Sequence, residues 1–204
     1  MRPCEDDFCR VFYDIIKGGV LMEKLFTKKI LLEIFDYLND LLFDNKLYLE
    51  LTVYGGSIMT LLYDNRPATK DIDSLFNTVN DELLKNIFKQ IQDVYQLNND
   101  WINDDVKGPI KTLIEEETII YREYSNLTIV QPIPEQLLAM KVLAARAEPS
   151  KDFVDAYILC RDLNITEKNQ LFDIVTKFIP RKALKERQLT FIKYLGEDLG
   201  YDWS

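Results

Sequence analysis

The sequence predicts an α/β or α+β core followed by a helical subdomain, and two observations support this fold class. All segments with strand character precede residue 133. In that part of the chain, amphipathic helical patterns lie between the strand segments. Beyond residue 133 only helical patterns remain, and Pro134, Pro149 and Pro180 punctuate them. A chain of 204 residues suits one domain, or one domain with a helical appendage.

The first expected elements are a helix, a strand and a second, short helix. Apolar residues recur at helical spacing over 23–44, which predicts an amphipathic helix. The segment 47–54 is rich in β-branched and aromatic residues and predicts a strand that ends at a pair of glycines. We expect Ser57 to cap a short helix at 58–63.

The rest of the core is expected to hold a strand, a helix capped by Asn80 or Asp81, an irregular polar segment and a β-hairpin. In chain order these elements are predicted at 71–76, about 81–95, 96–117, 118–124 and 127–131. The later helices are predicted at roughly 134–147, 150–162, 166–178 and 181–195.

Composition excludes several classes of function. The chain has no histidine, so Ser-His and Cys-His catalytic sites and histidine-ligated zinc are impossible. The net charge of −9 argues against a broad nucleic-acid surface. No window is long and apolar enough for a membrane helix. Three cysteines, Cys4, Cys9 and Cys160, show neither pairing logic nor metal-ligand spacing, which predicts a cytoplasmic protein.

We expect three regions along the chain. Residues 1–21 are interpreted as a translated leader, because Lys17-Gly18-Gly19 can be encoded by a purine-rich, ribosome-binding run shortly before the Met22 codon. The alternative is a genuine short N-terminal extension. The core is then predicted at 22–132 and the helical subdomain at 133–204.

Two carboxylates on alternate residues suggest a metal site. Asp71 and Asp73 flank Ile72 on the predicted strand, so both should point to one face while Ile72 points into the core. Like charges this close repel unless a cation lies between them. Mg²⁺ or Mn²⁺ suits such a pair, because hard divalent cations prefer oxygen ligands and often bind carboxylates together with substrate phosphates.

The glycine turn upstream supplies the features of a phosphate site. Gly55 and Gly56 let the backbone approach a ligand closely. The start of the following helix presents free N–H groups and a positive dipole end, and Ser57 adds a hydroxyl. Together with the two aspartates, this turn predicts a site for a metal-bound triphosphate. The alternative is a glycine turn and an acidic strand end without a ligand.

The window GGS…R…T…DID, which contains Arg66 and Thr69 as further candidate nucleotide-binding residues, resembles the nucleotidyltransferase superfamily. The variant is that of AbiEii-type proteins, the toxin-like partners of type IV toxin–antitoxin and abortive-infection pairs. Residues 133–160 resemble the second conserved block of that group. The resemblance spans about residues 30–162 and implies a nucleotidyltransferase-like mixed sheet core with flanking helices.

A lysine lies in the middle of an almost entirely apolar helical stretch, LLAMKVLAA. An unpaired ammonium would be unfavourable there, so Lys141 should pair with a carboxylate or reach an anionic ligand. Asp152 and Asp155 lie three residues apart on the next helix and are the expected partners. One alternative is that Lys141 and these carboxylates form a structural ion pair that links the two helices. The other is that a carboxylate positions Lys141 against a nucleotide phosphate. Arg146 is interpreted as a surface or linker charge, with a role in ligand binding as the alternative.

One feature departs from the family pattern. Catalytic members of the superfamily carry a third carboxylate on a later strand, but the strand LTIVQP contains none. Glu117 and Glu123 are the nearest acidic residues, and neither lies on that strand. Trp101-Ile102-Asn103 resembles a Trp-x-Asn of similar proteins and is interpreted as a loop anchor.

The resemblance implies Mg²⁺-dependent transfer of a nucleoside monophosphate from an NTP to a hydroxyl of RNA, such as tRNA, or of a protein. Asp71 and Asp73 would hold metal, and Lys141 would stabilise phosphate charge with Asp155 or Asp152 positioning it. A cognate antitoxin is an expected partner. A basic run on the last helices is an RNA contact or a solvated face; it comprises Lys177, Arg181, Lys182, Lys185 and Arg187. The rival prediction is a non-catalytic nucleotide-binding or protein-interaction module of the same fold.

Overall fold

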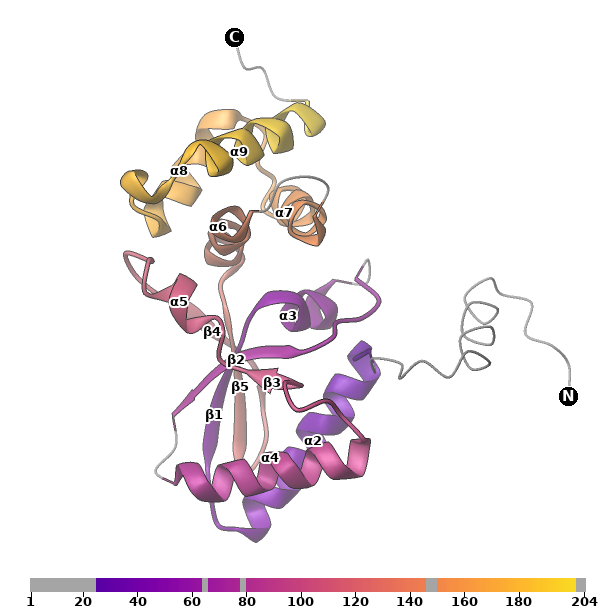
Figure 1. Cartoon of the computed structure of the whole chain (residues 1–204). Coiled ribbons are helices and arrows are strands. Elements are labelled where there is room, and N and C mark those ends of the chain that lie inside the picture. Colours follow the sequence, from indigo (N-terminus) through magenta and orange to yellow (C-terminus); the bar gives the residue numbers. More distant parts are fainter. Residues whose placement is uncertain (1–24, 64–65, 78–79, 146–149, 201–204) are drawn as a thin grey trace, which may run out of the picture.

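The computed structural model describes residues 25–63, 66–77, 80–145 and 150–200. It confirms a mixed α/β fold in which a five-stranded sheet with flanking helices precedes a group of C-terminal helices (Figure 1). The leader predicted at 1–21 and Arg146 lie outside the described residues. None of the helices in the described ranges combines the length and apolar character that a membrane crossing requires.

The sheet is mixed and has the strand order β3-β2-β1-β5-β4. Its inner strand β1 pairs antiparallel with β2 and parallel with β5, while β3 lies parallel to β2 and β4 antiparallel to β5. The strands are β1 (Leu49–Val53), β2 (Ile72–Asn77), β3 (Ile102–Asn103), β4 (Thr118–Glu123) and β5 (Leu127–Pro132).

One face of the sheet packs against α2 (Lys28–Asp44) and α4 (Asp81–Tyr95). Alternate residues of β1, beginning with Leu49, are fully buried on this face, as the period of two in a strand requires. The Phe76 ring of β2 packs edge-on against the Phe88 ring of α4, with centroids 5.4 Å apart. This face therefore holds the main core.

The opposite face of the sheet is covered at one end by a second, smaller apolar cluster. There Tyr54 and Leu75 pack with Val106 and with Met140, which belongs to α6 (Pro134–Ala144). Farther along β1, Glu50 is exposed to solvent. The partly covered end coincides with the start of β2, where the predicted aspartates lie.

The remaining helices follow the sheet in the chain and lie beyond one end of it (Figure 1). After α6 they are α7 (Lys151–Asp162), α8 (Lys168–Phe178), a 3₁₀ turn (Arg181–Ala183) and α9 (Glu186–Asp198). Phe153 of α7 packs edge-on against Phe191 of α9. The Ile114 N–H donates to the Phe178 carbonyl over 2.7 Å, which ties α8 to the segment that precedes β4.

Several sequence-based boundaries were wrong. The first helix begins at Lys28, because Thr27 caps it and Phe26 instead pairs with Thr69 in an isolated bridge. The short helix α3 spans Gly55–Leu62, so Ser57 lies within its first turn and does not cap it. The segment predicted as irregular contains β3 and the short helix α5 (Lys107–Ile110).

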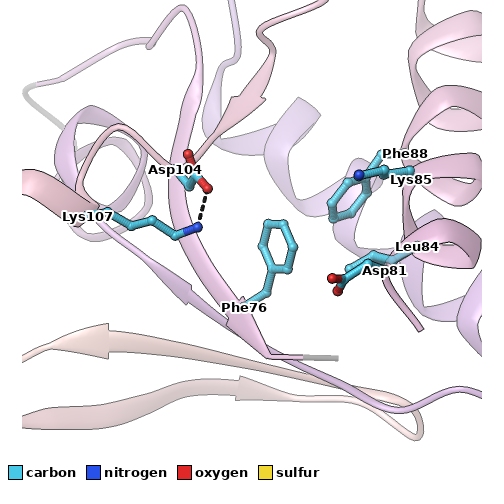
Figure 2. Close-up of a pocket in the computed structure, with 7 residues that line it drawn as sticks. All are labelled: Phe76, Asp81, Leu84, Lys85, Phe88, Asp104 and Lys107. Carbon is cyan, nitrogen blue, oxygen red and sulfur yellow. Dashed lines mark hydrogen bonds and ion pairs between the residues drawn. The ribbon is translucent and has the colours of Figure 1, made fainter. Parts of the chain in front are cut away.

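A cavity of about 480 Å³ opens between α4 and the chain that leads into α5 (Figure 2). Its lining comes from the end of β2, the first half of α4 and the start of α5. The lining residues are Phe76, Asp81, Leu84, Lys85, Phe88, Asp104 and Lys107.

Candidate functional site

The turn from β1 into α3 brings backbone and carboxylate into close contact. Gly55 has a φ of +60°, a left-handed conformation that favours glycine. A Cβ at this position would lie 2.1 Å from Oδ2 of Asp73. Glycine is therefore required at position 55 for two reasons: the backbone is left-handed there, and a side chain would collide with the Asp73 carboxylate. This contact places Asp73 beside the N-terminal turn of α3.

The second glycine is crowded by two other predicted site residues. A Cβ at Gly56 would lie 2.5 Å from Nη2 of Arg66 and 2.7 Å from Oγ1 of Thr69. The Ser57 hydroxyl is buried and lies 3.3 Å from the carbonyls of Tyr54 and Asp71, so it links α3 to the start of β2. The structure thus brings the predicted phosphate-binding residues together around the first turn of α3.

The two predicted metal ligands lie at the start of β2. Ile72 is fully buried, as expected, and Asp71 directly precedes the strand. The pKa of Asp73 is raised above its ordinary value, first by burial and then by the negative charge of Asp71. The positive charge of Lys141 and a hydrogen bond from Asn103 act in the opposite direction. The raised pKa of Asp73 thus comes mainly from burial and secondly from the neighbouring carboxylate.

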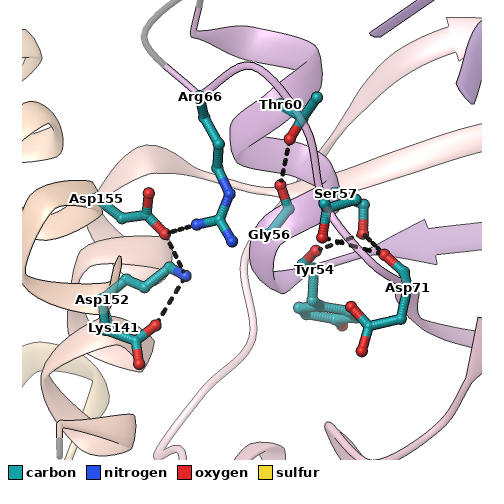
Figure 3. Close-up of polar contacts among 10 residues, drawn as sticks. Tyr54, Gly56, Ser57, Thr60, Arg66, Asp71, Lys141, Asp152 and Asp155 are labelled. Atoms are coloured by element: carbon teal, nitrogen blue, oxygen red, sulfur yellow. Dashed lines mark hydrogen bonds and ion pairs between the residues drawn. The ribbon is translucent and has the colours of Figure 1, made fainter. Parts of the chain in front are cut away.

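A charge cluster joins the core to the C-terminal helices (Figure 3). Nζ of Lys141 lies 2.7 Å from Oδ2 of Asp155 and 3.1 Å from Oδ1 of Asp152. The same Asp155 oxygen accepts a hydrogen bond from Nη1 of Arg66. Lys141 on α6, Asp155 on α7 and Arg66 after α3 are all largely buried. The pairing expected for Lys141 is present, and Arg66 is an additional member.

The charges around the cluster do not balance. Arg66 and Lys141 are paired with Asp152 and Asp155. Among these six residues that leaves the carboxylates of Asp71 and Asp73 without a cation of their own. Two neighbouring carboxylates are the donor set that a hard divalent cation takes, so the residues present fit Mg²⁺ or Mn²⁺. The basic groups and the α3 N-terminus beside them suit an anion.

Sequence reasoning missed the contribution of β3. In the parallel β2–β3 pair, Asn103 is the register partner of Asp73, and its side chain donates a hydrogen bond to that carboxylate. The Asn103 side-chain oxygen accepts a hydrogen bond from the Asp105 N–H over 3.0 Å. The charge of Asp105 also reaches Asp73. The Trp-x-Asn pattern was the available signal, since buried Trp101 anchors this segment.

The two glutamates considered for a third carboxylate lie elsewhere. Glu117 forms an ion pair of 2.6 Å with Lys177, and Glu123 is exposed at the end of β4. The neighbouring Glu116 instead accepts a hydrogen bond from the Tyr54 hydroxyl. Within the described ranges, no group of three acidic or cysteine side chains lies close enough to hold a metal ion.

The basic run on the terminal helices is partly engaged. Lys177 pairs with Glu117, and the Arg181 guanidinium lies over the Phe172 ring. Lys182, Lys185 and Arg187 are exposed to solvent. This arrangement leaves both interpretations of the run open.

Comparisons with family models, with curated proteins and with solved structures give no match for this chain.

Proposed function

We propose that this protein is a Mg²⁺-dependent nucleotidyltransferase, which moves a nucleoside monophosphate from an NTP to a hydroxyl group and releases pyrophosphate. One observation carries the proposal. The Asp73 carboxylate lies against Gly55 at the N-terminus of α3, and the charge of Lys141 reaches the same carboxylate. A carboxylate suited to a divalent cation and a helix start suited to an anion therefore lie side by side, within reach of the charge of a buried lysine.

Each residue has a role that follows from its position. Asp71 and Asp73 would hold the divalent cation, which when bound supplies positive charge to the attacking and leaving oxygens. The N–H groups of the first turn of α3 and the Ser57 hydroxyl would orient the phosphates. Arg66 and Lys141 would stabilise negative charge on the triphosphate, and Asp155 would position both basic groups.

The acceptor and biological setting come from the family resemblance of the sequence. On this basis the proposed acceptor is an RNA 3′ end, such as that of tRNA, or a protein hydroxyl. The protein would then be the toxin component of a pair with a cognate antitoxin. In the transfer, the acceptor oxygen forms a bond to the α-phosphorus while the bond from that phosphorus to the bridging oxygen breaks. The hydroxyl proton is released to solvent, and pyrophosphate leaves.

The experiment incubates the purified protein with Mg²⁺, each α-³²P-labelled NTP and total RNA, with products separated on RNA and protein gels. Label on RNA or on protein is expected for one or more NTPs. The Asp71→Ala/Asp73→Ala double variant should lose the label while keeping its fold, as judged by circular dichroism. A double variant that labels as well as the parent contradicts the proposed site.

A second function is a nucleotide-binding or protein-interaction module without catalysis. It is favoured by the absence, within the described residues, of a group of three acidic side chains that could hold metal. Calorimetry distinguishes the two functions. Metal-dependent NTP binding without any transfer of label favours the module, whereas binding together with transfer favours the enzyme.

A further inference from the structure

The outer edge of β2 is paired over only part of its length. The Ile72 N–H donates to the Trp101 carbonyl over 2.8 Å, whereas the Tyr54 N–H donates to the Asp73 carbonyl over 2.8 Å. Backbone groups alternate along a strand, so Ile72, Ser74 and Phe76 direct theirs outward, away from β1. The partner strand β3 ends at Asn103, opposite Asp73. No described strand therefore reaches the outward N–H and C=O of Phe76.

The cavity described above lies beside this open edge (Figure 2). Phe76, Leu84 and Phe88 supply its apolar lining. The Phe88 ring also packs edge-on against Trp101, with centroids 5.8 Å apart, which fixes the wall of the cavity. At about 480 Å³, the cavity has room for one large apolar side chain with part of the backbone that carries it.

Charged groups line the mouth of the cavity, and one cation there has no ion-pair partner among the described residues. Lys107 is paired with Asp104 on the side of the mouth that faces α4. Lys85 is exposed on α4 and forms no ion pair with any residue that the structure describes. An incoming acidic group would therefore find Lys85 available.

We propose that the β2 edge and this cavity bind an extended polypeptide segment of a partner protein, which adds a strand beside β2. Its backbone would pair with the outward N–H and C=O of Phe76. A bulky apolar side chain of the segment would fill the cavity, and an acidic side chain near it would pair with Lys85. This inference does not depend on the proposed nucleotidyltransferase activity.

The open backbone edge favours a peptide over a nucleotide at this cavity. A base could stack on Phe76 or Phe88, but it would not satisfy a strand N–H and C=O directed along the sheet. A nucleotide is therefore the competing ligand that the experiment must exclude.

The test uses the full chain and fluorescein-labelled nine-residue peptides, with binding measured by fluorescence anisotropy. The peptides alternate valine and threonine and carry a central anchor that is phenylalanine, leucine, isoleucine, tyrosine or tryptophan. An aspartate or a lysine follows the anchor by one or two positions. We expect saturable binding of at least one aspartate peptide, and N-methylation of its alternate backbone nitrogens should weaken binding about tenfold or more.

A charge-reversal variant makes the test specific for the site. Lys85→Glu should reverse the preference, so that lysine peptides bind better than aspartate peptides. Lys89→Glu, one turn farther along the same exposed helix surface and paired with Asp93, is the matched control and should leave the preference unchanged. The proposal is overturned if no peptide binds saturably, if N-methylation has no effect, or if both variants alter the preference equally. Competitive displacement of the peptide by AMP, abolished in Lys85→Glu, would also overturn it.

Discussion

Lys141 and Asp155 form an ion pair of 2.7 Å in which the two side chains are only 7% and 4% exposed. Charges this deeply buried lose most of their hydration, and each needs the other to offset that loss. Because α6 and α7 carry the two residues, the pair fixes these helices relative to each other. Arg66 joins the same Asp155 oxygen, so this carboxylate also ties the α7 helix to the core.

Replacing Asp155 should therefore destabilise the fold strongly. Asp155→Ala leaves two buried cations without their shared partner, and we expect the free energy of unfolding to fall by about 3–5 kcal/mol. Asp152, whose side chain is 25% exposed, also contacts Lys141, and Asp152→Ala should cost clearly less. Urea denaturation of the two variants measures the difference. Equal losses would show that Asp155 is not the main counter-charge of the cluster.

A single added methyl group at Gly55 should disrupt both the fold and the site. Gly55→Ala forces a side chain into a left-handed backbone and against the Asp73 carboxylate, so stability should fall by roughly 1–3 kcal/mol or more. Asp73 must also shift, so Mg²⁺-dependent NTP binding should be lost. Gly108→Ala is the control, because a Cβ at that position would meet no neighbouring atom within 4 Å. Thermal melts and calorimetry on both variants check the prediction, which fails if the two behave alike.

Asn103 should tune the candidate site without being essential to the fold. Asn103→Ala removes the hydrogen bond to Asp73 and the acceptor for the Asp105 N–H. We expect the affinity for Mg²⁺–NTP to fall about tenfold, in the range seen when groups that orient a metal ligand are removed. The neighbouring exposed Asp104→Ala should change this affinity little. Calorimetric titration at fixed Mg²⁺ measures both, and an unaffected Asn103→Ala protein would exclude a positioning role.

Alkaline pH should destabilise the protein through its buried thiol. Burial raises the pKa of Cys160 from 9.0 to about 12. The folded state therefore favours the neutral thiol, and its contribution to stability, complete below pH 9, is lost as pH rises from 9 to about 12. Melting temperatures recorded between pH 8 and 11 should fall more steeply for the parent than for Cys160→Ala. Parallel slopes would show that the thiol does not contribute to this pH dependence.

The sequence predicted the parts of the fold whose signals are local. Apolar periodicity predicted α2, a capping residue predicted the start of α4, and the turn at Ser125-Asn126 predicted the hairpin. Asn80, one of the two expected residues, caps α4. The elements β3 and α5 were missed because they span two and four residues, too few for a periodic pattern. Their positions depend on pairing with β2 and on packing against α6, which a local pattern does not contain.

The contacts of the candidate site likewise divide into some that a local sequence pattern predicts and others that it does not. A lysine in an apolar helix must find a carboxylate, so the partners of Lys141 could be predicted from the next helix. The pairing of Arg66 with Asp155 joins residues 89 positions apart, and no local rule selects that partner. The hydrogen bond from Asn103 to Asp73 likewise arises only when β3 pairs with β2.

The separation between Arg66 and Asp155 has a consequence for how the protein is made. A ribosome synthesises a chain from the N-terminus onward, so the N-terminal part emerges first, and domains begin to fold as they emerge. The segment that carries Arg66, Asp71 and Asp73 leaves the ribosome well before α7, which supplies the shared counter-charge. A growing chain therefore exposes an incomplete cluster with unmatched basic groups. The arrangement of charges in Figure 3 is reached only after α7 has emerged and docked during synthesis.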